Sequence, residues 1–385
     1  MKSPITRFSS VVHLNTYRSA DPLAAGIERF VGLEHITPEN LHIRSWGQVA
    51  DGVTFTNTFQ RGQVLFGKRR AYQRKVAFAE FDGVCSSDIY VFESKDPDAL
   101  LPELLPFICQ TEGFYQHAVK TSAGSLSPRT NWGQLADYEF PLPPLDEQRR
   151  IADLLWAADD SITEYQNVFS ATEKLELSLV AQYTKVKNSR EKMQIREFAD
   201  VAYGLTVDPS RRNSEEEKPY LRVANVGRNF IDLTEVKNIG FVKGDVERYA
   251  LQVGDVLVVE GHANVDEIGR AALWTGQLEE CLHQNHILRI RVRNNQEIHP
   301  KYLLTFINSP TGKSYMRSRA KSTSGLNTIN STVLNVMEIP VLPFNEQKEI
   351  LKVIGETEKT KEFTQSHLEN SLALKKKLLV SKLGG

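Results

Sequence analysis

The sequence predicts an α+β protein: two globular mixed α/β domains, related by pseudo-two-fold symmetry, joined by two long antiparallel helices that form a coiled coil. Three observations predict this fold. A proline-rich motif occurs twice, a long helical pattern follows each copy, and short β-type segments fill the chain before each copy. The 385 residues also exceed the roughly 250–300 residues at which a single core stops growing.

The repeated motif runs from Pro141 to Gln148 and again from Pro340 to Gln347, with a constant offset of 199 positions. Solenoid repeats have periods of roughly 20–50 residues, so this repeat is of another kind. It indicates a duplicated domain with a helix attached. The predicted boundaries are residues 1–144 and 191–343 for the domains, and residues 145–190 and 344–385 for the helices.

The first long helix is predicted to start at Asp146, because aspartate is a preferred N-cap residue. Apolar or small residues then alternate at spacings of 4 and 3 from Ile151 to Leu179, which is the heptad pattern of a coiled coil, and only Glu176 breaks it. About 40 helical residues would span roughly 60 Å. The predicted contact residues of this helix are Ile151, Leu155, Ile162 and Phe169.

The second long helix is predicted to start at Asn345, and its apolar seam is less regular. Lys361 and Lys375 interrupt the seam, and Gly355 weakens the helix by up to ~1 kcal/mol. Either the two helices pack on each other or each packs on its own domain; their matching lengths and start signals favour the first alternative. The residues that fit the second seam are Ile350, Ile354, Leu368, Leu372 and Leu379, of which Ile350, Ile354 and Leu368 are the predicted contact residues.

The regions before each motif are rich in short β-type segments. The repeat continues into them, since residues 30–36 resemble 220–226 and residues 60–65 resemble 252–257. Each half also has a short helical segment, then a loop rich in Gly, Ser and Asn. The middle parts differ most, so we expect two sites of one kind that recognise different targets. The predicted strands are residues 63–66, 75–79, 88–92, 255–259 and 286–292, the short helices 102–111 and 300–308, and the loops 122–131 and 322–330.

The composition is that of an ordinary globular protein, with 41% hydrophobic and 25% charged residues. No apolar run is long enough for a transmembrane helix, and the N-terminal residues lack the apolar core of a signal peptide. Three cysteines form no even framework, which predicts a reduced, cytoplasmic protein. The net charge is −1, so any surface for nucleic acid must be local.

Residues 61–75 form the densest charge cluster, with six basic residues, no acidic residue, and a tyrosine inside it. A run of charges is commonly a solvated face. Six uncompensated positive charges in a nearly neutral protein instead favour an anionic partner such as nucleic acid. The residues predicted to bind the first part of a DNA target are Lys68, Arg69, Arg70, Tyr72, Arg74 and Lys75, with Ser125, Arg129 and Asn131 from the loop of residues 122–131.

The second half has a weaker basic group between residues 313 and 321, again without acidic residues. Hydroxyl and amide side chains in the following loop could donate to phosphate oxygens. Residues 260–264 offer donors and acceptors for base edges, although a plain turn is the alternative. The residues predicted to bind the second part of a target are His262, Asn264, Arg317, Arg319, Lys321 and Ser324.

No catalytic or metal-binding pattern is convincing. Cys281, His283 and His286 could supply metal ligands, but no separate partner cluster completes a site, so packing is favoured. Gly312-Lys313-Ser314 is similar to the end of a phosphate-binding loop, but Ile307 stands where its first glycine would be. The sequence therefore predicts no catalytic residue and no metal site.

The doubled Pro…Glu-Gln…Ile motif with its helices, together with residues 66–72 and 259–262, resembles the specificity subunit of type I restriction–modification enzymes over essentially the whole chain. The resemblance implies that each domain is a target recognition domain for one half of a split double-stranded DNA sequence. It implies that the helices set the spacing and dock two methyltransferase subunits, with restriction subunits joining for cleavage. This chain would hold no cofactor; S-adenosylmethionine, ATP and Mg²⁺ would bind the partners. The alternatives are a coiled-coil adaptor that recognises no DNA, or a DNA-modifying or DNA-cleaving enzyme with an undetected site.

Overall fold

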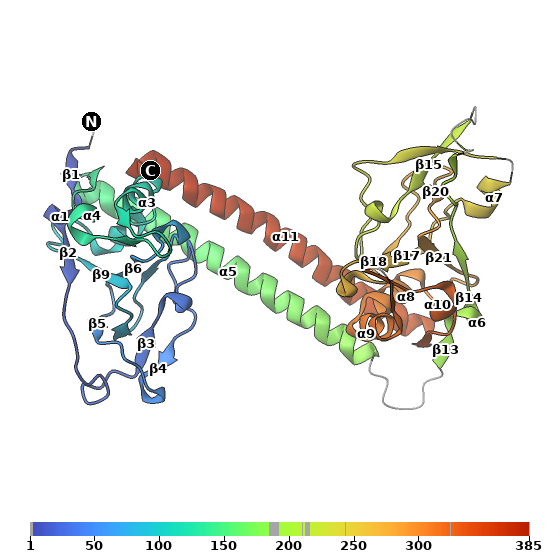
Figure 1. Ribbon diagram of the computed structural model, residues 1–385, viewed down its shortest axis with the longest axis horizontal. Coiled ribbons are helices and arrows are strands. Elements are labelled where there is room, and N and C mark those ends of the chain that lie inside the picture. Colours follow the sequence, from blue (N-terminus) through green and yellow to red (C-terminus); the bar gives the residue numbers. More distant parts are fainter. Residues whose placement is uncertain are drawn as a thin grey trace. The chain divides into compact units, whose positions relative to one another are not determined.

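The computed structural model describes residues 3–184, 192–209, 211, 216–242, 244–323 and 325–384. These residues fall into two compact units. Unit 1 combines Met1–Asn167 with Thr364–Gly385, and unit 2 is Val168–Phe363. Each unit therefore contains one globular domain, here called domain 1 or domain 2, together with part of each long helix (Figure 1).

Domain 1 is built on two four-stranded sheets, in the orders β2-β9-β6-β7 and β4-β3-β8-β5. Fully buried aromatic side chains, among them Phe8, Phe66, Phe92 and Phe114, fill the core beside the first sheet. The strands are β1 (Ile5–Arg7), β2 (Val12–Asn15), β3 (Arg29–Val31), β4 (Gly47–Gln48), β5 (Asn57–Phe59), β6 (Val64–Gly67), β7 (Val76–Phe78), β8 (Gly83–Cys85), β9 (Ile89–Ser94), β10 (Ser122–Ala123), β11 (Arg129–Thr130) and β12 (Glu139–Pro141). The short helices are α1 (Phe8–Val11), η1 (Leu33–His35), η2 (Val49–Asp51), η3 (Ala71–Gln73), η4 (Pro102–Leu104), α2 (Leu105–Ile108), α3 (Glu112–Lys120) and α4 (Trp132–Leu135).

Domain 2 has a four-stranded sheet in the order β14-β21-β17-β19 and two three-stranded sheets, β16-β15-β20 and β18-β23-β22. Its strands are β13 (Lys192–Gln194), β14 (Ala199–Tyr203), β15 (Glu217–Leu221), β16 (Lys237–Gly240), β17 (Val256–Val259), β18 (Gly261–His262), β19 (Ala271–Leu273), β20 (Leu282–His283), β21 (Ile287–Val292), β22 (Lys321–Thr323), β23 (Leu326–Thr328) and β24 (Glu338–Pro340). Its short helices are α6 (Ile195–Phe198), η6 (Val223–Asn225), α7 (Asp245–Tyr249), η7 (Val265–Glu267), α8 (Pro300–Asn308), α9 (Pro310–Arg319) and α10 (Ser331–Asn335).

The two domains share one frame. The sheet β2-β9-β6-β7 has the same antiparallel order as β14-β21-β17-β19, and the pair β1–β12 has its counterpart in β13–β24. The registers also agree, because Val64 faces Phe78 across β6 and β7 as Val256 faces Leu273 across β17 and β19. The predicted duplication is therefore confirmed by the strand order and the registers of these sheets.

The long helices are α5 (Leu145–Thr184) and α11 (Phe344–Leu383). Both begin directly after a proline, so the prediction that Asp146 caps the first helix is wrong. Asp146 lies in the first turn, where its carboxylate pairs with Arg149 at 3.1 Å. Asn345 likewise lies inside the first turn of α11. None of the described helices is long and apolar enough to cross a membrane.

The glutamine that ends each motif fastens the helix start to its domain. Gln148 is buried; its amide donates to the carbonyls of Ala99 (3.0 Å) and Pro143 (2.9 Å), and its oxygen accepts from the Leu101 amide (2.8 Å). Gln347 repeats this arrangement with Glu297, Leu342 and His299 at 2.8, 2.8 and 2.9 Å. A buried carboxamide needs hydrogen-bond partners, and each glutamine makes the same three hydrogen bonds. This explains why both copies of the motif end in glutamine.

Within each unit, α5 and α11 pack on each other, as predicted. In unit 1, the rings of Tyr165 and His367 lie 5.4 Å apart at a tilt of 45°, and Glu147 pairs with Lys382 at 3.4 Å. The earlier residue of α5 contacts the later residue of α11, so the two helices are antiparallel. The alternative also holds in part, because Ile151 and Leu155 belong to the core of domain 1 and Ile350 and Ile354 to the core of domain 2.

The seam of α11 is more regular than the sequence indicates, because the two lysines that interrupt it are paired with acidic residues of α5. Lys361, which interrupts the seam of α11, pairs with Glu176, which interrupts the seam of α5. Lys375 pairs with Asp159 in the same way. Leu372 is 46% exposed, and its assignment to the seam is wrong. The seam continues at spacings of 3 and 4 through Ile354, Thr357, Lys361, Thr364, Leu368, Ser371 and Lys375.

Candidate nucleic-acid interface

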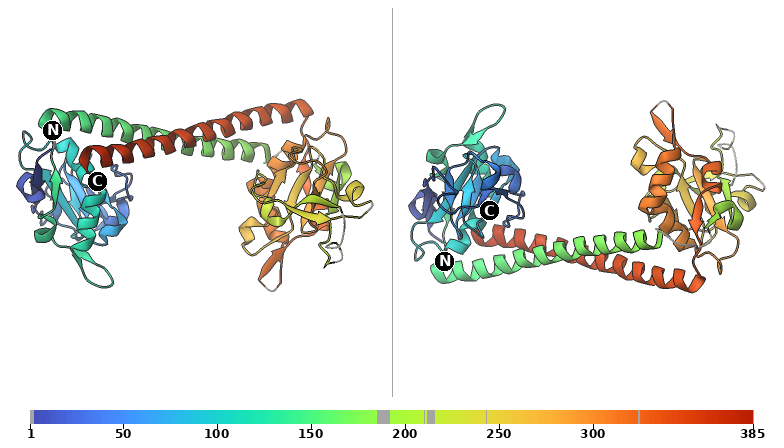
Figure 2. Two further views of the ribbon diagram at one scale, coloured as in Figure 1. Left: turned by 90° about the horizontal axis from the view of Figure 1, so that it is seen from above. Right: turned by 90° about the horizontal axis from the view of Figure 1, so that it is seen from below.

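Two segments that the sequence marked separately come together in domain 1. The basic residues that follow β6 lie against the hairpin of β10 and β11. The Thr130 amide donates to the Lys68 carbonyl at 2.9 Å, and the Arg70 amide donates to the Pro128 carbonyl at 2.7 Å. Arg69 and Arg129 form a single antiparallel bridge. Figure 2 shows this hairpin as a green loop that projects from the domain.

One carboxylate organises the cations of this surface. Asp88 accepts from Arg129 Nε at 2.7 Å and from Arg69 NH1 at 3.3 Å. Burial pushes the pKa of Asp88 upward, but the hydrogen bonds and charges of Arg129 and Arg69 outweigh it and hold the pKa below its ordinary value. Lys68 Nζ lies 4.6 Å above the ring of Tyr90, and burial lowers the pKa of Lys68. Two arginines therefore share one carboxylate with Lys68 nearby, and we call Lys68, Arg69, Arg129 and Asp88 the cationic surface of domain 1.

Four more of the residues predicted to bind DNA lie on or beside the hairpin or are exposed. Tyr72 and Ser125 are exposed, and Arg70 donates to Ser127 Oγ at 3.3 Å at the edge of the hairpin. Asn131 is occupied as the N-cap of α4, with 2.9 Å from its Oδ1 to the Gly133 amide.

Arg74 and Lys75 have partners inside the domain. Arg74 pairs with Glu112 at 2.6 Å and with Glu39 at 3.2 Å, which neutralises its charge. Lys75 Nζ donates to the Leu33 carbonyl at 2.6 Å. Both residues therefore stabilise the fold around η1 and α3, and neither is brought to the cationic surface.

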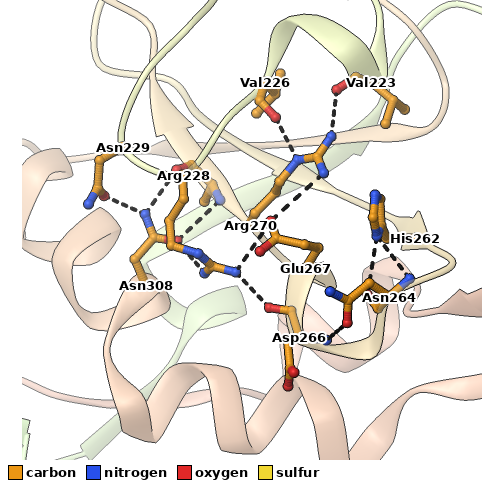
Figure 3. A network of polar contacts seen from close by, with 11 residues as sticks. Val223, Val226, Arg228, Asn229, His262, Asn264, Asp266, Glu267, Arg270 and Asn308 are labelled. Carbon is orange, nitrogen blue, oxygen red and sulfur yellow. Dashed lines mark hydrogen bonds and ion pairs between the residues drawn. The ribbon is translucent and has the colours of Figure 1, made fainter. Parts of the chain in front are cut away.

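In domain 2 the corresponding hairpin is β22–β23, and β23 pairs with β18, with His262 opposite Asn327. His262 Nδ1 accepts from the Asn264 amide at 3.0 Å, and the Asn264 side chain caps η7 through the Asp266 amide (Figure 3). Arg317 pairs with Asp266 at 3.2 Å. Arg319 lies 3.8 Å above the Tyr315 ring, Lys321 is exposed, and Ser324 lies outside the described residues.

Sequence reasoning missed two arginines that organise this surface. Arg270 donates to the carbonyls of Val226 (2.7 Å) and Val223 (3.1 Å), and Arg228 NH2 donates to the Asp266 carbonyl at 2.9 Å (Figure 3). Arg270 occupies the place of Lys75, since both follow an equivalent turn and bind the carbonyl that starts η1 or η6. Alignment of the two halves across their insertions is the signal that could have found it.

The position just after the central strand carries opposite charges in the two domains. Lys68 follows β6 and lies near Asp88, whereas Glu260 follows β17 and accepts from His286 Nδ1 at 2.7 Å. The main-chain contacts are the same. The Lys68 amide donates to the main-chain carbonyl of Asp88, and the Glu260 amide donates to the main-chain carbonyl of His286, both at 3.0 Å. Domain 2 therefore presents a carboxylate where domain 1 presents an ammonium group.

The cysteine–histidine cluster is part of the packing. Cys281 is buried, which raises the pKa of its thiol to about 12. His283 is fully buried with Nδ1 3.0 Å from the Tyr249 carbonyl, and burial lowers the pKa of His283 to about 4. Among the described residues, no group of three or more His, Cys, Asp or Glu side chains is placed to hold a metal ion.

The chain is thus a duplicated domain, each copy followed by a long helix, and the polar surfaces of the two copies differ in charge at the position after the central strand. The sequence matches the family model of the type I restriction modification DNA specificity domain at residues 45–168 and again at 188–374, and the chain belongs to this family.

Individual relatives agree with this membership. The chain is 24% identical to the type I restriction enzyme EcoKI specificity subunit of Escherichia coli K12 over 304 residues, which is 71% of this chain and 63% of that subunit. It is 33% identical to the EcoDI specificity subunit of Escherichia coli over 161 residues, covering 38% and 35% of the two chains. These matches span less than two thirds of the length of the curated relatives.

Solved structures show the same fold. The S subunit of a type I restriction–modification system from M. genitalium aligns with a TM-score of 0.61 at 15% identity, over 98% of this chain and 94% of that one. A chain from a study of complex assembly and conformational transition of the type I R-M system aligns with a TM-score of 0.53 at 18% identity, over 98% and 96%.

Proposed function

We propose that this chain is the DNA-recognition subunit of a type I restriction–modification complex and is itself no enzyme. Residues 1–144 and 191–343 would each recognise one half of a bipartite double-stranded DNA target. The helices of residues 145–190 and 344–385 would set the spacing of the halves and dock two methyltransferase subunits, with restriction subunits joining for cleavage. S-adenosylmethionine, ATP and Mg²⁺ would then bind to those partners.

The observation that carries the proposal is the cationic surface of domain 1. The side chains of Arg69 and Arg129 are 39% and 52% exposed, and Lys68 lies beside them, while Asp88 is the one carboxylate they share. Guanidinium groups that are oriented by a carboxylate and still open to solvent suit phosphate oxygens and guanine edges. The family's description as a DNA specificity domain supports DNA as the ligand of this surface.

The helices support a role in spacing. Each has 40 residues and a length of roughly 60 Å, which exceeds one turn of B-DNA at about 34 Å. Linking two recognition domains raises the effective concentration of the second contact once the first is made. Two short recognition events would thereby combine into one specific event.

The test is the double substitution K68A/R69A in the chain assembled with its methyltransferase. We expect affinity for the cognate DNA to fall about 100-fold and the slope of log K against log salt to fall by about 2, since two phosphate contacts are lost. The matched control is Arg74→Ala, which removes a charge already neutralised by Glu112 and Glu39 and should change affinity less than about threefold. Equal losses in both variants, or an unchanged salt slope, would contradict DNA recognition and favour the adaptor alternative.

A second test separates the two domains. Replacing residues 191–343 with the corresponding segment of another family member should change one half of the recognised sequence and leave the other half unchanged, as measured by methylation of a DNA library. A change in both halves, or in neither, would contradict the assignment of domain 2.

Insertion of one heptad after Phe169 should lengthen the gap between the halves in the same assay.

A further inference from the structure

The junction between domain 1 and α5 is filled by aromatic side chains. Trp156 of α5 lies between Phe78 of β7 and Phe107 of α2, with ring centroids 5.1 and 5.0 Å away. Its indole N–H donates to the Glu103 carbonyl at 3.0 Å. An indole therefore joins the helix to both a strand and a helix of the domain.

The duplication places an equivalent junction in unit 2, between domain 2 and α11. The motif offset of 199 puts Gly355 where Trp156 stands. The strand registers put Leu273 at the place of Phe78. Because Gln148 binds Leu101 as Gln347 binds His299, an offset of 198 puts Thr305 at the place of Phe107 and Lys301 at the place of Glu103. All three aromatic rings are thus replaced by smaller residues.

The replacement leaves a groove at this junction, which we call the unit 2 groove. Its volume is about 620 Å³, and Leu273, Thr305 and Lys301, the equivalents of the residues that contact Trp156, all line it. Glu358, one helical turn beyond Gly355 on the same face of α11, lines it too. A Cβ added to Gly355 would meet no atom within 4 Å.

The walls of the unit 2 groove are held by polar contacts. Asn308 accepts from Arg228 NH1 at 3.3 Å and donates to Asn229 Oδ1 at 2.5 Å and to the Ala271 carbonyl at 2.9 Å (Figure 3). On the helix side, Lys301 pairs with Glu358 at 2.7 Å. The groove is therefore formed before any ligand binds, as is usual for binding sites.

Two large apolar side chains that line the unit 2 groove are open to solvent, among charged neighbours such as Lys301 and Glu358. Phe230 is 60% exposed and Leu177 is 57% exposed, and both line the groove. Large exposed apolar side chains around a preformed pocket are typical of protein interaction sites.

We propose that the unit 2 groove receives an aromatic side chain, of indole size, from a methyltransferase subunit. The partner's identity rests on the proposed function; the chemistry of the occupant rests on Trp156, which shows what fills the same frame in unit 1. Aromatic side chains in preformed pockets supply much of the energy of protein interfaces. Because unit 1 supplies its own indole, two docked methyltransferase subunits would be held by unequal contacts.

The test is Gly355→Trp in the full chain, which fills the groove from within. We expect affinity for the methyltransferase subunit to fall at least tenfold, and binding of the probe N-acetyltryptophanamide, seen by NMR with the original chain, to disappear. Thr305→Phe fills the groove from the opposite wall and should act in the same direction. Gly355→Ala leaves the groove open, and Val353→Trp places the same ring at an exposed position of α11; both should leave the affinity unchanged.

Unchanged methyltransferase affinity in both Gly355→Trp and Thr305→Phe would overturn the proposal, whether or not the probe binds. An equal loss in Val353→Trp would also overturn it, because the effect would not be specific to the groove. If the original chain bound no methyltransferase, the proposed function would fail as well, and that result would be visible before any substitution is made.

Discussion

The polar sites that follow β6 and β17 have the same main chain and opposite side chains. Lys68 with Asp88 in domain 1 corresponds to Glu260 with His286 in domain 2, and in both places an amide–carbonyl hydrogen bond of 3.0 Å fixes the strand end. Because the main chain holds this position, the side chains can change without loss of the fold. The comparison shows how duplication of one domain can produce two recognition surfaces with different preferences.

Two ion pairs between α5 and α11 also differ between the units, in how far they are buried. The pair Lys375–Asp159 in unit 1 has side-chain exposures of 8% and 5%, whereas the pair Lys361–Glu176 in unit 2 has 26% and 21%. Removing one member of a fully buried pair leaves the other charge without a partner, and this cost falls as water reaches the site.

The largest expected effect is therefore that of Asp159→Ala, which leaves Lys375 buried and unpaired. We expect the free energy of unfolding of unit 1 to fall by about 3 kcal/mol. The matched variant Glu176→Ala in unit 2 should cost less than about 1 kcal/mol. Urea unfolding followed by circular dichroism measures both. Equal costs would show that burial does not distinguish the two pairs.

The next effect concerns a feature that the two units share. Gln148→Ala and Gln347→Ala each leave a buried amide and two carbonyls without their partners, and each should lower the free energy of unfolding by about 2–3 kcal/mol. The control is Gln365→Ala, whose exposed side chain contacts only Glu369 and should cost less than about 0.5 kcal/mol. A large difference between the two motif variants would contradict their structural equivalence.

Much of this architecture could be predicted from the sequence because its signals are periodic or repeated. The heptad spacing predicted the helix pair, the motif offset predicted the duplication, and short β-type segments predicted the strands β6, β7, β9, β17 and β21. The seam of α11 was misjudged because apolar periodicity does not recognise a lysine as a buried residue; Lys375 fits only because Asp159, 216 positions away, neutralises it.

The candidate site was harder to predict, because charge clusters say nothing about partners distant in sequence. Arg74 belongs to the same basic run as Arg69, yet it forms ion pairs with Glu112 and Glu39 inside domain 1. Asp88 organises the cationic surface from outside the run. The helix start was misplaced for another reason: the cap rule chose Asp146, while the buried Gln148 fixes where α5 begins.

A smaller effect is expected at the position of opposite charge. A carboxylate can accept from the amino group of cytosine, so Glu260→Gln, which exchanges one acceptor oxygen for a donor, should reduce discrimination at one base pair of the second half-site about tenfold. Competition binding with a panel of single-base variants measures this. The companion variant Lys68→Met should change discrimination only in the first half-site. If either variant altered the preferences of the other half-site, the assignment of one domain to one half would be contradicted.

The smallest expected effect is the pH dependence that His42 gives to unit 1. His42 lies with Nε2 3.0 Å from Asp159 Oδ2 and Nδ1 2.6 Å from Glu80 Oε1, whereas Thr275 replaces Glu80 in unit 2. The contact with Asp159 raises the pKa of His42 most, burial opposes it, and Glu80 raises it further, so the net pKa lies above its ordinary value. Lys375 faces the same carboxylate of Asp159 and limits this gain.

Because the folded state binds the proton more tightly than the unfolded chain, the stabilisation by His42 is complete below about pH 6.5, the ordinary histidine pKa, and disappears as pH rises through the raised value. His42→Gln should therefore lower the unfolding free energy of unit 1 by about 1 kcal/mol at pH 6 and by much less at pH 9. Urea unfolding of both proteins at the two pH values measures the difference. A cost that is the same at both pH values would show that His42 acts through packing against Trp156, and that its charge contributes nothing to the junction.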